Sequence, residues 1–115
     1  MFILNGGQIL NLPRNLRVDF SGKEAILMEN LKVSAKSSPN LVAGAIAGII
    51  RESESVEIQA IGAGAVNQAI KAVAAANVFL EGDGLSVVCK PKFIEVELNG
   101  ESRTAMSLVV MREKP

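Results

Sequence analysis

The chain has 115 residues, which is enough for one domain with a sizeable hydrophobic core. Its 12 basic and 12 acidic residues cancel, which speaks against a protein that binds nucleic acid by bulk positive charge. It has no histidine and one cysteine, which excludes acid–base catalysis by histidine and an intramolecular disulfide and speaks against a structural zinc site.

The first 27 residues differ from the rest of the chain. Gly6 and Gly7 lie between two short apolar runs, a pattern typical of a tight hairpin, and residues 16–20 alternate as a short strand does. Met28 offers an alternative start to a complete domain. We therefore predict an N-terminal extension or arm over residues 1–27 and one domain over residues 28–115. The arm packs on the domain or on a neighbouring molecule, or it is dispensable. The sequence does not distinguish between these alternatives.

A strand and a helix form the first predicted unit of the domain. Residues 31–35 alternate apolar and polar side chains, which predicts a half-buried strand. Ser38 then stands at an N-cap position and Pro39 at the first helical position, where its missing N–H does no harm, so a helix is predicted from there to about Glu52. The predicted apolar face of this helix consists of Leu41, Val42, Ala45, Ile46, Ile49 and Ile50.

A second unit of the same kind follows. Residues 57–61 form the next predicted strand, and residues 62–64, Gly-Ala-Gly, make the turn out of it. A helix is predicted from about Ala65 to Phe79. Its predicted inward face consists of Val66, Ala69, Ile70, Val73 and Ala74. The opposite side carries Asn67, Gln68 and Lys71.

The C-terminal part of the chain is predicted to form a long hairpin. Residues 85–98 form a strand region interrupted at Pro91, where an edge position or a bulge is expected. Asn99-Gly100 is a strong signal for a two-residue hairpin turn, and residues 103–112 return as the last strand. The order β-α-β-α-β-β predicts an α+β fold: a two-layer sandwich with a four-stranded mixed sheet and both helices on one face.

Two corners of this fold join the end of a strand to the start of a helix, at residues 36–40 and 62–68. Backbone N–H groups at helix starts, with the helix dipole behind them, favour phosphate or carboxylate. The candidate anion-binding residues at these corners are Lys36, Ser37, Ser38, Asn40, Gly62 and Gly64. The alternatives are a solvated loop lysine at the first corner and, along the second helix, a solvated polar face.

The same residues support an enzymatic function less well than anion binding. G-A-G-A-V-N at residues 62–67 superficially resembles the dinucleotide fingerprint G-x-G-x-x-G. It lacks the third glycine, and about 20 residues further on Glu81 and Asp83 come only after the helix has ended. A Ser–Lys nucleophile pair at Lys36 lacks a recognisable oxyanion or acid–base partner. We therefore expect no enzymatic activity and no cofactor.

Membrane and targeting signals are also weak. The longest purely apolar run, residues 41–50, is far shorter than the roughly 20 residues that cross a bilayer. The N-terminus lacks a charged start followed by an apolar stretch, so no signal peptide is expected. Cys89 follows a mostly apolar run and is expected in the core. We expect a cytoplasmic protein with no membrane partner.

Three stretches carry a resemblance to a known family. They are L-K-V-S-A-K-S-S-P-N-L-V-A-G-A-I-A-G at residues 31–48, E-I-Q-A-I-G-A-G-A-V-N-Q-A-I-K-A-V-A at 57–74 and G-E-S-R-T-A at 100–105. In order and spacing over residues 28–112 they closely resemble the stage V sporulation protein S family, whose members regulate spore formation in bacteria and also occur in bacteria that form no spores. Residues 1–27 have no counterpart in the pattern of that family.

The resemblance implies a mode of action. The family's β-α-β-α-β-β order is similar to that of the Alba chromatin proteins, which are dimeric and bind DNA or RNA through a loop lysine, the second helix start and the hairpin arms. By this resemblance Lys36 takes the role of the loop lysine, supported by Ser37, Ser38 and Asn40. The residues that it places beside the dimer or nucleic-acid face, or on the arm, are Asn67, Gln68, Lys71 and Arg103.

The leading hypothesis is a non-enzymatic regulator that binds DNA or RNA as a homodimer or higher oligomer, through helix N-termini and a loop lysine. Two alternatives remain. One is a protein-interaction or scaffold module whose helix glycines and alanines form a subunit interface. The other is a sensor that binds a phosphorylated small ligand at the paired helix starts.

Overall fold

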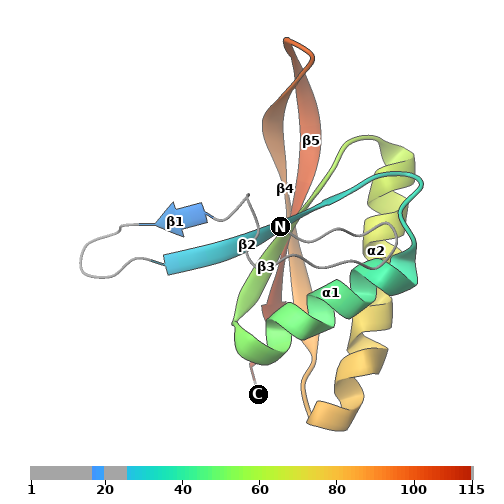
Figure 1. Cartoon of the computed structure of the whole chain (residues 1–115), viewed down its shortest axis with the longest axis vertical. Coiled ribbons are helices and arrows are strands. Elements are labelled where there is room, and N and C mark those ends of the chain that lie inside the picture. Colours follow the sequence, from blue (N-terminus) through green and yellow to red (C-terminus); the bar gives the residue numbers. More distant parts are fainter. Residues whose placement is uncertain (1–16, 20–25, 115) are drawn as a thin grey trace.

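Figure 1 shows the computed structural model of the chain, which describes residues 17–19 and 26–114. Most of the predicted arm lies outside the described residues. The elements, in chain order, are β1 (Arg17–Asp19), β2 (Ile26–Val33), α1 (Pro39–Glu52), β3 (Ser55–Ala60), α2 (Ala63–Leu80), the short 3₁₀ helix η1 (Glu81–Asp83), β4 (Val87–Leu98) and β5 (Glu101–Arg112). From β2 onward the predicted β-α-β-α-β-β order is confirmed.

The strands form one mixed sheet in the order β1-β2-β3-β5-β4. β2 and β3 are parallel, with Leu31 opposite Ile58, whereas β5 runs antiparallel to both β3 and β4. The short β1 adds antiparallel to β2. The predicted four-stranded mixed sheet is therefore confirmed as β2-β3-β5-β4, with β1 at its outer edge.

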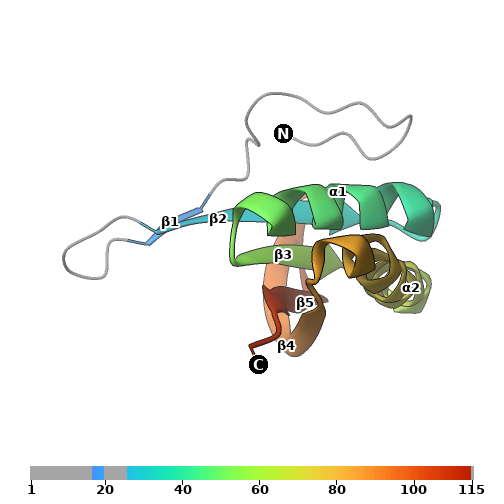
Figure 2. The same ribbon diagram turned by 90° about the horizontal axis from the view of Figure 1, so that it is seen from below.

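The core lies between this sheet and the two helices, which contact each other (Figure 2). Alternate side chains of the strands point into it, as the period of two requires. The strand residues in the core are Leu31, Val33, Val56, Ile58, Val87, Leu108 and Val110, each at most 5% exposed. Cys89, expected in the core, is only partly buried because it lies on the edge strand β4, and this burial raises the pKa of its thiol.

The N-terminus of α1 is built as its sequence predicts. Ser38 is the N-cap, with its hydroxyl oxygen accepting from the N–H of Leu41 at 3.3 Å, and Pro39 is the first helical residue. The predicted apolar face is buried except for Leu41, which is 42% exposed. Gly44 and Gly48 lie on the exposed side of the helix, and a Cβ added at either one would have no atom within 4 Å.

The buried face of α2 differs from the predicted one. It is a stripe of small residues, Ala65, Ala69, Ala72 and Ala76, completed by Val73 and Leu80. Ile70, predicted to face inward, is 49% exposed, and Ala74 is exposed too. The reason is direct packing of α2 against α1, where alanines let the two helices approach closely. The predicted inward face is therefore correct at Ala69 and Val73 and wrong at Ile70 and Ala74.

The hairpin of β4 and β5 extends beyond the rest of the sheet (Figure 1). Its turn residues Asn99 and Gly100 have φ of 54° and 80°, the two positive values of a type I′ turn. β4 is an edge strand with an unbroken register, so Pro91 occupies the predicted edge position without a bulge. β3 pairs with β5 only as far as Met106, and residues 101–105 therefore project by roughly 15 Å.

Candidate nucleic-acid interface

Topology brings the two predicted corners and the hairpin to one end of the molecule. β2 and β3 are parallel, so the segments that follow them leave the sheet at the same end. β5 is antiparallel to β3, so the hairpin projects from that end as well. In Figure 1 the loop before α1, the start of α2 and the hairpin all lie in the upper half of the molecule.

The first corner is a closed turn stabilised by serine. The N–H of Ser37 donates to the carbonyl oxygen of Ser34 at 3.1 Å, and the N–H of Ser34 donates to the hydroxyl oxygen of Ser37 at 3.0 Å. The Ser34 hydroxyl oxygen in turn accepts from the N–H of Lys36 at 3.2 Å. These bonds fix the backbone, while the side chain of Lys36 stays exposed. The turn thus presents one cation from a defined position.

The second corner is an uncapped helix start. Gly62 is the N-cap of α2, with φ of 91°, a value that suits glycine, and it has no side chain to cap the helix. The N–H of Val66 donates to the carbonyl of Gly62 at 3.0 Å. The three preceding N–H groups, of residues 63–65, have no acceptor among the described residues, and the first turn contains no acidic residue. They are therefore available to an anion.

The two corners contact each other. A Cβ built on Gly64 would lie 3.0 Å from the Cβ of Ala35, so α2 starts against the loop that carries Lys36. The side-chain amide of Gln68 donates to the carbonyl oxygen of Ser37 at 2.8 Å. Gln68, predicted at the nucleic-acid or dimer face, therefore also holds the first corner in place from α2.

The remaining predicted residues lie on the surface around these corners. Asn40, Asn67 and Lys71 are exposed, the first at the second position of α1 and the others on α2. Arg103 is exposed on the projecting part of β5, opposite Val96, and forms no hydrogen bond or ion pair with the described residues. The structure thus brings the two corners together and places Arg103 on the hairpin beside them.

Charge is distributed unevenly despite the net charge of zero. The stretches 31–51 and 58–80 contain no aspartate or glutamate, whereas the exposed Lys32, Lys36 and Lys71 belong to them. The projecting hairpin carries three carboxylates, Glu95, Glu97 and Glu101, and Glu95 accepts hydrogen bonds from two neighbouring hydroxyls. Five acidic residues lie near the other end of the helices: Glu52, Glu54, Glu81, Asp83 and Glu113. The two corners are therefore basic in their own sequence, whereas the hairpin beside them is mixed in charge.

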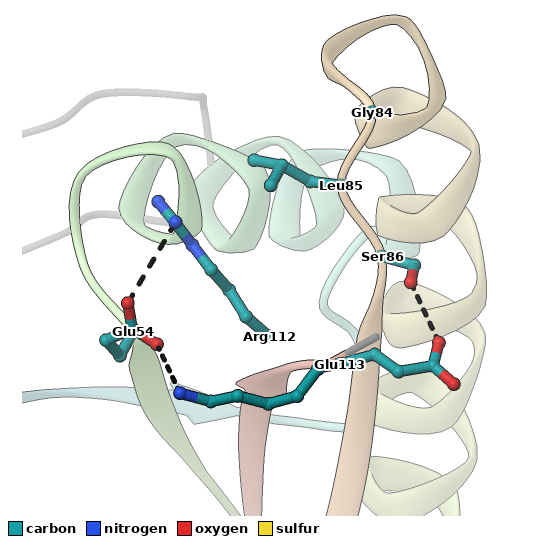
Figure 3. A pocket seen from close by; sticks show the side chains of 7 residues that line it. Glu54, Gly84, Leu85, Ser86, Arg112 and Glu113 are labelled. Atoms are coloured by element: carbon teal, nitrogen blue, oxygen red, sulfur yellow. Dashed lines mark hydrogen bonds and ion pairs between the residues drawn. The ribbon is translucent and has the colours of Figure 1, made fainter.

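That other end holds a pocket of about 490 Å³, shown in Figure 3. The Arg112 guanidinium donates to the carbonyl oxygen of Ile50 at 2.8 and 3.0 Å and to that of Arg51 at 3.2 Å, which caps the C-terminus of α1. The hydroxyl of Ser86 donates to Glu113 at 2.8 Å. The polar side chains that line this pocket bond to one another and to the backbone. We therefore assign them a structural role and not a role in binding a ligand.

A buried polar cluster lies on the face of the sheet that the helices do not cover. Glu57 is 1% exposed and accepts hydrogen bonds from Asn30, at 2.9 Å, and from the hydroxyl of Ser107. On the other face of the sheet, which the helices cover, burial raises the pKa of the Glu29 carboxyl, and the charge of Glu52 adds to the rise. Nothing in the sequence indicates the cluster around Glu57, because polar residues alternating along a strand are typical of a solvated face.

Fold and site together define a class: a two-layer α+β protein whose two helix starts and projecting hairpin share one end, with basic corners and a hairpin of mixed charge. The family model described as Stage V sporulation protein S (SpoVS) matches residues 29–113. The chain therefore belongs to the stage V sporulation protein S family, which associates it with sporulation. Among the described residues, no helix is long and apolar enough to cross a membrane.

Proposed function

We propose that this protein is a non-enzymatic, sporulation-associated regulator that binds DNA or RNA as an oligomer. The observation that carries the proposal is the contact between the Lys36 turn and the uncapped start of α2, formed by two stretches of chain that contain no carboxylate. A nucleic-acid phosphate at this contact accepts hydrogen bonds from the free N–H groups of residues 63–65 while the Lys36 ammonium neutralises its charge.

Backbone N–H groups and one lysine recognise phosphate and not base sequence. The serine hydroxyls of Ser37 and Ser38 accept hydrogen bonds within the loop, and the Ser38 hydroxyl still has its own proton to donate to a phosphate oxygen. The Ser37 hydroxyl can do the same when the Ser34 hydroxyl is the donor between the two. Arg103, on the projecting hairpin, supplies a second cation away from the corner. Contacts at two separate points fix the register of the protein on a strand.

A second copy of the chain belongs to the proposal, because one corner carries few charges and two linked corners bind more tightly. Ile70 is 49% exposed on α2, and Phe93 is 78% exposed on β4. Ile70 shares a side of α2 with Asn77, which bonds to the backbone of Val87 in β4. Phe93 lies on the same face of β4 as Val87. These apolar side chains line the side of α2 and the hairpin where a second copy would pack.

Lys36→Ala tests the proposal, with Lys114→Ala as the control because Lys114 is 82% exposed near the opposite end. Fluorescence anisotropy with labelled single-stranded and duplex oligonucleotides is measured over a range of salt concentrations. We expect Lys36→Ala to weaken binding similarly for all sequences and to lower the slope of log affinity against log salt by about one per corner.

Lys114→Ala is expected to bind like the unmodified protein. An absence of binding to DNA and RNA at low salt would overturn the proposed function. Equal losses in the two variants would show that the Lys36 corner is not the phosphate contact.

A further inference from the structure

A second pocket, of about 260 Å³, lies where the hairpin leaves the sheet. Lys32 and Gln59, which line it, alternate along their strands with core residues, so the pocket opens on the face that the helices do not cover. Ser34 and Ala35, from the Lys36 turn, line it too. The pocket is therefore continuous with the first corner.

Its walls are mostly apolar. Ile61 contributes from the segment after β3, and Val96 and Leu98 contribute from β4. The carboxamide of Gln59, a group with both donors and acceptors, has no hydrogen-bond partner among the described residues. Apolar walls with a single amide suit a flat ring that carries hydrogen-bonding groups on its edge. The volume is below the roughly 300–1,000 Å³ of pockets for drug-sized ligands, which limits the occupant to a small ring system.

Cations flank the pocket on both sides. Lys36 directly follows Ala35 of the lining, and Lys32 belongs to the lining itself. On the hairpin, Arg103 pairs with Val96, and paired residues of antiparallel strands project on the same face, so Arg103 lies beside the other wall. Two carboxylates lie near these cations: Glu97 belongs to the lining, and Glu101 pairs with Leu98 on the same face as Arg103. A ring bound here would therefore have cations for a phosphate on either side of it.

We propose that this pocket binds one unpaired base of a single-stranded nucleic acid, with the flanking phosphates at Lys36 and Arg103. This inference rests on the proposed function and makes it more specific. Bases in a duplex are stacked and paired, so a base enters the pocket only from a single strand. The protein therefore prefers single-stranded nucleic acid to duplex, and it distinguishes a strand with bases from one without.

The test compares oligothymidylate with an oligomer of abasic sites that has the same number of phosphates. We expect the unmodified protein to bind oligothymidylate about tenfold more tightly, a difference of about 1.4 kcal/mol. Val96→Trp fills the pocket and should abolish this difference. Val88→Trp is the matched control, since Val88 is 43% exposed on the same face of β4 but outside the pocket, and it should keep the difference.

Each outcome decides a separate point. Equal binding of the two oligomers by the unmodified protein overturns the base pocket and leaves the proposed function intact, whereas binding of neither overturns both. A difference that persists in Val96→Trp also overturns the pocket. If Val96→Trp does not fold, as judged by circular dichroism, Gln59→Ala replaces it and is expected to reduce the difference. If Gln59→Ala still binds oligothymidylate more tightly than the abasic oligomer by the same factor, the pocket does not bind the base.

Discussion

Arg112 illustrates how a single residue connects distant parts of the chain. Its guanidinium donates to the carbonyl oxygens of Ile50 and Arg51, so the last strand caps the C-terminus of α1. Nothing near Arg112 in the sequence indicates this role, because the acceptors lie some sixty residues away. Ser38 is the opposite case, since its capping role could be predicted from the Ser-Pro pair alone.

We predict that Arg112→Ala lowers the free energy of unfolding by about 2 kcal/mol, because the end of α1 loses charge-assisted hydrogen bonds in a partly buried position. Urea unfolding followed by circular dichroism measures the change. Arg103→Ala is the control: Arg103 is exposed and bonds to no described residue, so its loss should leave stability unchanged. Coinciding unfolding curves for Arg112→Ala and the unmodified protein would contradict the capping role.

At the scale of elements, the existence and order of helices and strands were predictable, and their buried faces were predictable only in part. The turn at Asn99-Gly100 and the start of α1 depend on neighbouring residues. The inward face of α2 depends instead on α1, against which alanines pack more closely than Ile70 would. Periodicity shows that a helix has an apolar face, but several faces of α2 are apolar.

The exposed glycines of α1 give a prediction for that element. Gly44→Ala and Gly48→Ala should each raise the free energy of unfolding by about 0.5–1 kcal/mol, because an added Cβ meets no atom within 4 Å and alanine favours the helix. Gly64→Ala is the contrasting variant, since its Cβ would crowd Ala35 at 3.0 Å, and we expect it to lower stability.

Thermal and urea unfolding of the three glycine variants measure these effects. A loss of stability in Gly44→Ala or Gly48→Ala would contradict the prediction and would indicate that the outer side of α1 packs closely against another chain in solution.

At the scale of the whole molecule, the two ends differ. One end has the paired helix starts and the projecting hairpin, while the other holds acidic residues that are largely paired, as in the ion pair of Arg51 with Asp83 at 2.8 Å. A net charge of zero therefore does not describe the surface that a phosphate backbone would meet. The two corners carry lysines and no carboxylate of their own, whereas the projecting hairpin carries Glu95, Glu97 and Glu101 beside Arg103.

The proposed oligomer leads to a prediction about the assembly state of the protein in solution. Light scattering should show a dimer or larger assembly that survives high salt, because the proposed contact is apolar. Phe93→Ser should dissociate it, whereas Val88→Ser should not, since Val88 is 43% exposed on the opposite face of β4 from Phe93. A monomeric unmodified protein would contradict the prediction, as would dissociation by Val88→Ser. A stable assembly that ignores nucleic acid would favour the scaffold alternative.

By itself the sequence determined the order of elements, the cap at Ser38, the turn at Asn99-Gly100 and the family, because these depend on short stretches of adjacent residues. The tertiary structure alone decided that Glu57 is buried and that the loop of Lys36 contacts the start of α2. Both depend on elements that are distant in the chain, and the burial of a side chain is set by what packs against it rather than by its neighbours in sequence.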